Sequence, residues 1–433
     1  MIRRAVAAFT LAIAAASPLA CGPGAEAPKR PPLAEKWLAR AEASYKAGDF
    51  EDAKTSVEEG LRVAPHDAEL RTLGGRLALA RLDFSAALGM TDGLSTTDAH
   101  GIRGRAQWYA GNLDNAADEL EAMLTDPSVK DPWARDVARL ARKGNGRHPF
   151  AMEGGVVALV QMPEAGPALI VPCELEGEQV LTMIATGAPE VIIDSTARSE
   201  PTWVSLRFGD RIDVRDVPAL TQDLSGISRV LGAPIKALLG VNLLRHIHAT
   251  FDRRGGQFVV RLADPPSPPT ASRLPTYYAR GGAMLVRMQI APREDGSSLF
   301  YVDSSQPYTL AMQDSLWKKA GVDVSQMVPS TILPNSRAGT IPSLRLGGMD
   351  FPSVPGLALS SVSEQAPNMD IDLGGVVGAE LLEAFRVTFT DAGRAIWVEP
   401  DPTMMTDNRG PARPPLVGPD PLPPVGTEGA KKP

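Results

Sequence analysis

The spacing of apolar residues changes near residue 146, and the change divides the chain into two unlike parts. From Leu33 to about Gly146, apolar and small residues recur at helical spacing, as in WLARAEASYKAGDFEDAKTSVEEGL. Beyond this point, Gly, Pro and acidic turns separate short apolar runs such as ALIVPCEL, EQVLTMIA, AMLVRMQI and SLFYVD. The first pattern predicts an all-α region, and the second predicts small all-β barrel lobes.

The β-rich part contains one pattern twice. The first copy reads LTMIATGAPEVII and later ALLGVNLL, and the second reads LFYVDSSQPYTLA and later GVVGAELL. Gly240 and Gly378, in the two apolar-Gly blocks, are 138 residues apart, as are Leu206 and Leu344 in the segments between the motifs. Two blocks matched at one spacing predict two lobes of the same fold in tandem.

These ordered blocks resemble the retropepsin-like aspartic proteases, in which a hydrophobic strand ends in Asp-Thr/Ser-Gly and a later apolar run ends in Gly before a short helix. The resemblance covers about residues 155–262 and 280–400. It implies that each lobe contributes one turn to a shared site, where two aspartates share a proton. Asp303 stands at the expected place in the second copy, but Ala185 replaces the acid in the first.

The missing acid decides the predicted activity. Peptide hydrolysis by this device needs one carboxylate to activate water and one carboxylic acid to protonate the scissile carbonyl. Ala185 supplies neither, so Asp303 is the sole remaining acid and is expected to be insufficient, since acid–base help is worth about 10²–10⁴ in rate. Glu190 and Asp194 follow the first turn and would need a different backbone path to reach the lost position.

The residues next to these positions are expected to shape the turns and the cleft. Gly240 and Gly378 would allow close backbone approach behind each motif, a structural role. An Asp followed by two serines is also typical of a turn residue that bonds its own backbone. The second copy departs from the family at Ser305, where Gly is usual. The turn residues themselves are Thr186, Gly187, Ser304 and Ser305.

The helical part has a repeat of its own. The turns Gly48-Asp49-Phe50, Leu82-Asp83-Phe84 and Gly111-Asn112-Leu113 separate paired helical segments. This pattern resembles tetratricopeptide repeats in three units, which implies a stacked solenoid whose concave surface binds extended protein segments. Arginines recur in this part of the chain and have two interpretations: they contact an acidic partner, or they form a solvated charged face. They are Arg71, Arg76, Arg81, Arg103 and Arg105.

The N-terminus carries a predicted export signal. Arg3 and Arg4 precede the run AVAAFTLAIAAA, which is too short for a bilayer span and is typical of a secretion signal. Ala20-Cys21 resembles a bacterial lipoprotein cleavage site, although Pro18 departs from its usual pattern. The resemblance implies a periplasmic or envelope protein anchored by lipid on Cys21. An ordinary signal peptide with an incidental cysteine is the alternative.

Composition narrows the range of partners. The chain of 433 residues has a net charge of −7 and no basic block interleaved with aromatics, so we expect no nucleic-acid partner. His246 and His248 would share one face of a strand, but no Cys, Asp or Glu cluster completes a metal site. We therefore predict no metal and no cofactor. Cys173 is left as a lone thiol, expected to be a buried small apolar residue.

The predicted protein is thus a degenerate, catalytically inactive peptidase of the cell envelope that binds peptides or proteins through its inter-lobe cleft and its helical repeats. The alternatives are an active aspartic endopeptidase that pairs Asp303 of two chains in a homodimer, and a structural scaffold that acts through the helical repeats. The predicted segments are a signal peptide 1–20, a tether 21–32, the helical repeats 33–146, the first lobe 152–263, a Pro-rich linker 264–276, the second lobe 277–400 and a disordered Pro-rich tail 401–433.

Overall fold

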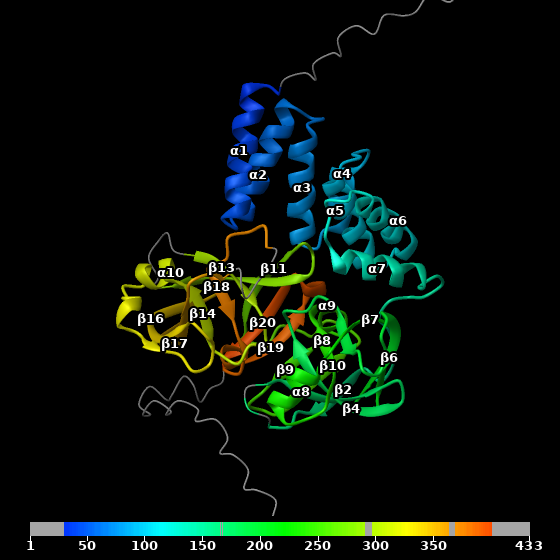
Figure 1. Cartoon of the computed structure of the whole chain (residues 1–433), viewed down its shortest axis with the longest axis vertical. Helices are drawn as coiled ribbons and strands as arrows, with labels where there is room; N and C mark the ends of the chain where they lie inside the picture. The colour runs from blue at the N-terminus through cyan, green and yellow to red at the C-terminus, as the bar shows by residue number, and fades with distance from the viewer. Residues whose placement is uncertain (1–29, 165, 167, 291–296, 363–368, 401–433) are drawn as a thin grey trace, which may run out of the picture.

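The computed structural model describes residues 30–164, 166, 168–290, 297–362 and 369–400 (Figure 1). The predicted signal peptide, most of the tether with Cys21, and the Pro-rich tail lie outside these residues. The described chain begins with a helical region and continues into β-barrels, as the sequence predicts. The helices of the first region are α1 Pro32–Lys46, α2 Phe50–Val63, α3 Ala68–Ala80, α4 Phe84–Thr91, α5 Thr97–Tyr109, α6 Leu113–Leu124 and α7 Pro132–Arg142.

The same turn joins the helices of each of the first three pairs. Its backbone bond runs from the N–H of the capping residue to the carbonyl five residues earlier, as from Asp49 to Ser44 and from Asp83 to Ala78. Asp49 and Asp83 each accept a free backbone N–H of the helix that follows, whereas Asn112 makes no such side-chain bond. The residue before each cap has a left-handed backbone: Gly48 (φ 74°), Leu82 (φ 55°) and Gly111 (φ 80°).

The first lobe closes into a six-stranded barrel. The strands run in the order β7-β5-β8-β4-β3-β6, and β6 pairs again with β7, while β1 extends the sheet beside β7. Two short helices, α8 (Ser225–Leu231) and α9 (Val241–His246), belong to this lobe. The strands are β1 Ala151–Gly154, β3 Ile170–Leu175, β4 Glu178–Ala185, β5 Val191–Asp194, β6 Thr202–Phe208, β7 Ile212–Gln222 and β8 Ile235–Gly240.

The second lobe repeats this closure. Its barrel has the order β16-β17-β14-β18-β13-β12, and β12 pairs again with β16, while the short β15 extends the sheet. The helices α10 (Asp314–Lys319) and α11 (Ala379–Leu382) follow β14 and β18. The strands are β12 Ala283–Ile290, β13 Ser297–Val302, β14 Leu310–Gln313, β15 Val328–Pro329, β16 Arg337–Leu346, β17 Met349–Leu359 and β18 Gly375–Val377.

A further set of strands joins the two lobes in the order β11-β20-β19-β9-β10-β2. Thr250 on β9 pairs with Thr388 on β19, and their Oγ1 atoms are 2.8 Å apart. These residues are separated by the same 138 positions as the sequence repeat, so the internal two-fold relation passes between them. The strands are β2 Val157–Gln161, β9 Thr250–Asp252, β10 Gln257–Arg261, β11 Ser272–Ala279, β19 Phe385–Thr390 and β20 Ala395–Pro400.

The predicted linker 264–276 is too long at its C-terminal end. Strand β11 begins at Ser272, and residues 272–275 pair with β20. Leu274 is buried, so this half of the Pro-rich segment belongs to the joining sheet rather than to a free connection.

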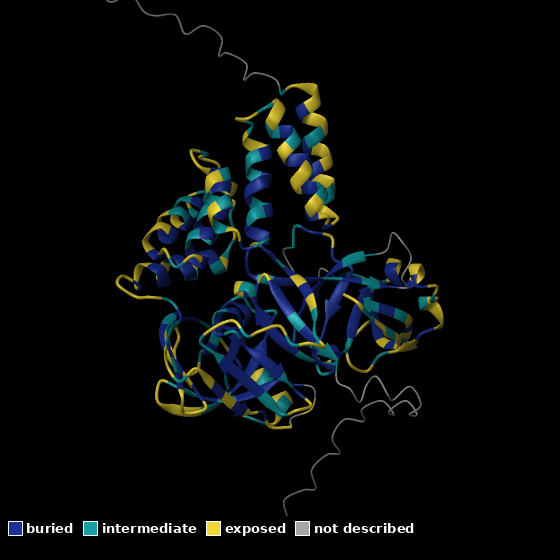
Figure 2. Ribbon diagram, turned by 180° about the vertical axis from the view of Figure 1, so that it is seen from behind, coloured by how far each residue is buried: buried dark blue, intermediate teal, exposed yellow. Residues whose placement is uncertain are grey.

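The helical region packs on both lobes (Figures 1 and 2). Tyr45, Phe50 and Leu77 from α1–α3 share an apolar core with residues of the second lobe such as Leu285 and Leu299. The helices α5–α7 form another core that includes Trp203 of the first lobe. The helices α1–α3 therefore cover part of the second lobe, and α5–α7 cover part of the first lobe.

Candidate functional site

The turns after β4 and β13 meet where the two barrels adjoin, and two side-chain hydroxyls hold them together. The Thr186 N–H donates to Ser304 Oγ, and the Ser304 N–H donates to Thr186 Oγ1, each over 3.0 Å. The Thr186 hydroxyl donates to the Val302 carbonyl over 2.9 Å, and the Ser304 hydroxyl donates to the Ile184 carbonyl over 2.8 Å. All four residues are buried, so water does not compete for these bonds.

Asp303 brings one carboxylate to this junction and is only 7% exposed. Its Oδ1 accepts the N–H of Ser305 over 3.0 Å and the hydroxyl of Ser305 over 2.6 Å, and its Oδ2 accepts the amide of Gln306 over 3.0 Å. A β-carbon added at Gly187 in the facing turn would lie 2.6 Å from this carboxyl group. Asp303 therefore faces the first lobe, as the resemblance to the proteases implies. It also bonds the backbone of its own turn, as a turn aspartate does.

No described acidic residue of the first lobe takes the place of the lost acid. Ala185 ends β4 and is 2% exposed, within an apolar cluster of its own lobe. Asp194 bonds the Thr196 hydroxyl over 2.6 Å and lies 3.4 Å from the Lys236 ammonium. Its pKa is lowered, mainly by the Thr196 bond. Glu190 points toward the helical region instead. Neither acid therefore reaches the position of the lost aspartate.

Glu190 is buried at the contact between the helical region and the first lobe. Its Oε1 accepts the Trp108 indole N–H over 2.9 Å, and its Oε2 accepts the Asn242 amide over 3.3 Å. The Arg245 Nε–H donates to the side-chain oxygen Oδ1 of Asn242 over 2.7 Å, so Asn242 lies between Arg245 and the Glu190 carboxylate. Burial raises the pKa of Glu190 and lowers the pKa of Arg245, because both lose hydration. This buried polar chain ties α5 to α9.

Two tyrosines complete the surroundings of Asp303, and the sequence pattern alone did not single them out. The Tyr301 hydroxyl donates to the Gly187 carbonyl over 2.7 Å, which adds a contact between the turns. Burial and the nearby Asp303 charge raise the pKa of Tyr301 and of Tyr308. For Tyr301, strand alternation was the available signal, because it lies on β13 two residues before Asp303.

The predicted structural glycines lie directly behind the turns. A β-carbon at Gly240 would collide with the Glu190 carbonyl oxygen, and one at Gly378 would collide with the Tyr308 carbonyl oxygen. Both positions therefore require glycine for close backbone approach. Ser305 stands where the family has glycine, but its φ is not positive, so a serine fits this turn without backbone strain.

The remaining candidate residues are engaged elsewhere. His246 ends α9 and His248 follows it in a turn, so the expected strand with both on one face is wrong. His248 bonds Asp264, and the described residues contain no group of three His, Cys, Asp or Glu side chains suited to a metal ion. Cys173 is buried, as expected, and its burial raises its pKa to about 12.

The five arginines proposed for an acidic partner are held within the helical region. Their acceptors are carboxylates or helix-end carbonyls: Met90 and Asp92 for Arg71, Asp98 for Arg76, Glu51 for Arg81, Glu119 for Arg103 and Asp131 for Arg105. This favours the solvated charged face over partner contacts. Across the described ranges, no helix has the length and apolar character needed to cross a bilayer.

Comparisons with known proteins give distant similarities. No family model matches the chain, and no curated protein matches it. Among solved structures, soybean basic 7S globulin matches with 12% identity over 58% of this chain and 95% of its own, at a TM-score of 0.37. A retropepsin-like aspartic protease from Rickettsia conorii matches with 16% identity over 30% of this chain and 91% of its own, at 0.23. The Arabidopsis OM64 TPR domain matches with 19% identity over 26% of this chain and 92% of its own, at 0.23. All these identities and TM-scores are low, so they assign the chain to no family.

Proposed function

We propose that this chain is a catalytically inactive relative of the retropepsin-like aspartic proteases, carrying tetratricopeptide-type helical repeats, and that it binds peptides or proteins. The observation that carries the proposal is the pair of interlocked turns with one carboxylate between them. The hydrogen bonds between Thr186 and Ser304 hold the turns of the two lobes together, as the proposed relationship requires. Ala185 stands where the second catalytic acid would be, so the acid pair is incomplete.

The loss matters because the single acid has no group with which to exchange a proton. Asp303 accepts hydrogen bonds from Ser305 and Gln306, and no described carboxylate lies in the facing turn. The hydroxyl of Tyr301 is engaged by Gly187, and its raised pKa makes it a poor acid at neutral pH. One carboxylate alone does not supply both the general base and the general acid of amide hydrolysis.

Binding needs less than hydrolysis. Extended peptides gain much of their affinity by adding a strand to exposed backbone groups, and this does not depend on a carboxylate pair. At the junction Ser305 and Pro307 are exposed and Gly187 is half-buried, so the turns are within reach of a ligand from solvent. The helical repeats would add a second binding surface of the kind typical of solenoids.

The homodimer alternative has less support. It requires Asp303 of two chains to approach each other, but each Asp303 already packs against Gly187 of its own first lobe. The joining strands β9 and β19 pair the lobes within one chain. Freeing Asp303 for a partner chain would therefore break a buried junction.

Two assays on the full chain test the proposal. Peptide-library binding, followed by calorimetry on the best ligand, should give a Kd that Asp303→Asn changes less than threefold, whereas a bulky Ser305→Trp at the exposed turn should weaken it at least tenfold. Cleavage of a denatured protein at acid pH should stay at background in wild type and in Asp303→Asn. Activity that Asp303→Asn abolishes would refute the inactive assignment, and binding lost only when residues 32–142 are blocked would favour the scaffold.

The proposed location in the envelope has its own test. Cys21 would carry the lipid after cleavage, so Cys21→Ser should move the protein from the membrane fraction to the soluble exported fraction. If the wild-type chain is found in the soluble fraction without lipid, the ordinary signal peptide is correct.

A further inference from the structure

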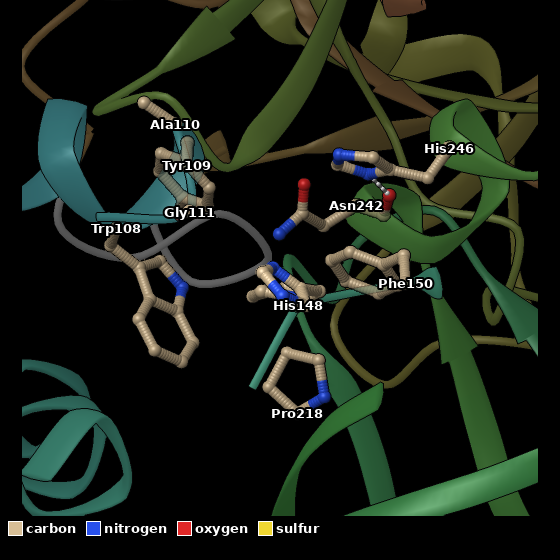
Figure 3. Close-up of a pocket in the computed structure, with 10 residues that line it drawn as sticks. Trp108, Tyr109, Ala110, Gly111, His148, Phe150, Pro218, Asn242 and His246 are labelled. Atoms are coloured by element: carbon tan, nitrogen blue, oxygen red, sulfur yellow. Dashed lines mark hydrogen bonds between the residues drawn. The ribbon is translucent and has the colours of Figure 1, made fainter. Parts of the chain in front are cut away.

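A cavity of about 250 Å³ lies between the helical region and the first lobe (Figure 3). None of its lining residues belongs to the paired turns, so it is separate from the junction at Asp303. The end of α5 forms one side, and α9 with the segment before β1 forms the other. The residues that give it its chemistry are Trp108, Tyr109, His148, Phe150, Asn242 and His246.

The walls combine the edges of buried aromatic rings with neutral polar groups. Trp108, Tyr109 and Phe150 contribute rings, while no Asp, Glu, Lys or Arg side chain lines the cavity. Pockets that hold drug-sized ligands have volumes of about 300–1,000 Å³ and are lined mostly by apolar side chains with a few placed polar groups, so this cavity is slightly smaller than that range. The size and the lack of charge therefore favour a small neutral ligand.

His246 supplies a directed acceptor in this wall. Its Nδ1 lies 2.6 Å from the Asn242 carbonyl oxygen, which only accepts, so Nδ1 carries the proton and Nε2 is left with a lone pair. Burial lowers the pKa of His246 to about 3, so the ring stays neutral. The Phe150 ring stacks on it with centroids 4.3 Å apart, which fixes the ring plane.

The backbone at Phe150 is strained. Its φ is 60°, a left-handed value that bulky residues rarely adopt. Strain of this kind collects at ligand sites, where the surrounding structure holds it in place. Here it holds an aromatic ring against the histidine of the cavity.

We propose that this cavity binds a neutral hydroxylated ring, namely one pyranose unit of a saccharide. The ring edges of the aromatic side chains at the wall contact the C–H groups of such a ring, and a sugar hydroxyl donates to His246 Nε2. The exposed His148 offers a second polar contact at the wall. An anionic or cationic ligand would find no counter-charge among the lining side chains.

The test uses the full chain and unmodified sugars. Glucose, galactose, mannose and N-acetylglucosamine are titrated by saturation-transfer NMR and by the tryptophan fluorescence that Trp108 contributes. At least one sugar should bind saturably at millimolar concentrations. His246→Asn keeps a donor for the Asn242 carbonyl but removes the Nε2 acceptor, so binding should weaken about three- to tenfold.

Two further variants control for folding. Ala110→Trp places a large side chain at an exposed lining position and should abolish binding while the melting temperature is unchanged. His248→Asn alters the neighbouring histidine, which bonds Asp264 outside the cavity, and should leave affinity unchanged. Failure of all four sugars to saturate, or binding that survives Ala110→Trp, would overturn the proposal. Saturable binding of phenol without any sugar would overturn the ligand class.

Discussion

Removal of the Ser304 hydroxyl is expected to weaken the junction of the two lobes. In Ser304→Ala, the Ile184 carbonyl loses its donor at 2.8 Å and the Thr186 N–H loses its acceptor at 3.0 Å. Ile184 is 0% exposed and Thr186 is 1% exposed, so water does not replace the hydroxyl. Each buried group left without a partner costs about 1–3 kcal/mol, so with two such groups the free energy of unfolding should fall by about 2–6 kcal/mol.

Urea unfolding and hydrogen exchange measure this effect. With a slope of about 2 kcal/mol/M, the unfolding midpoint in urea should fall by about 1–3 M. The Thr186 amide should also lose exchange protection, because its only bond in the turn is to Ser304. Both readouts should change together if the hydroxyl holds the turns.

The neighbouring Ser305 provides the matched control. It is exposed, and its hydroxyl bonds Asp303, so Ser305→Ala should lower the free energy of unfolding by less than about 1 kcal/mol. If Ser304→Ala stays within about 0.5 kcal/mol of wild type and the Thr186 amide keeps its protection, the interlocked turns do not stabilise the junction and the reasoning is wrong.

Three further predictions concern other buried groups. The pKa of Glu190 is raised above its ordinary 4.5 in the folded state, so the folded state binds more protons and stability should fall as pH rises above about 4.5. Glu190→Gln should make the melting temperature less dependent on pH in this range. An unchanged pH dependence would contradict the prediction. Gly378→Ala should lower the melting temperature or prevent soluble expression because of the collision with the Tyr308 carbonyl, whereas Gly226→Ala in α8 has open space and should be neutral or stabilising by up to about 1 kcal/mol. With its pKa raised to about 12, Cys173 should resist thiol reagents in the folded state and react after denaturation, as followed by peptide mapping; rapid labelling of the native protein would refute its burial.

The sequence predicted the elements whose causes are local. The turns at Gly48 and Gly111 mark helix starts because each has a left-handed glycine, and at Gly48 the next residue, Asp49, also caps the helix. The barrels followed from short apolar runs, and the spacing of Gly240 and Gly378 predicted their repetition. Ala185 was identified by alignment of the two copies.

The errors arose where tertiary context overrides local signals. Prolines at 264–276 indicated a linker, but Pro275 lies within β11, where the strand is held by pairing with β20. The His-x-His spacing suggested a strand, whereas His246 ends a short helix. The contact of Trp108 with Glu190 joins residues 82 positions apart, and no single-sequence pattern encodes such a pairing.

The strands that join the lobes make the order of synthesis important. Strand β9 pairs on one side with β10, which is nearby in sequence. Its other edge pairs with β19, which is synthesised more than 130 residues later. Until then, the half-made chain exposes an unpaired edge that other chains can join. Nascent chains stopped before Phe385 should therefore depend on a chaperone.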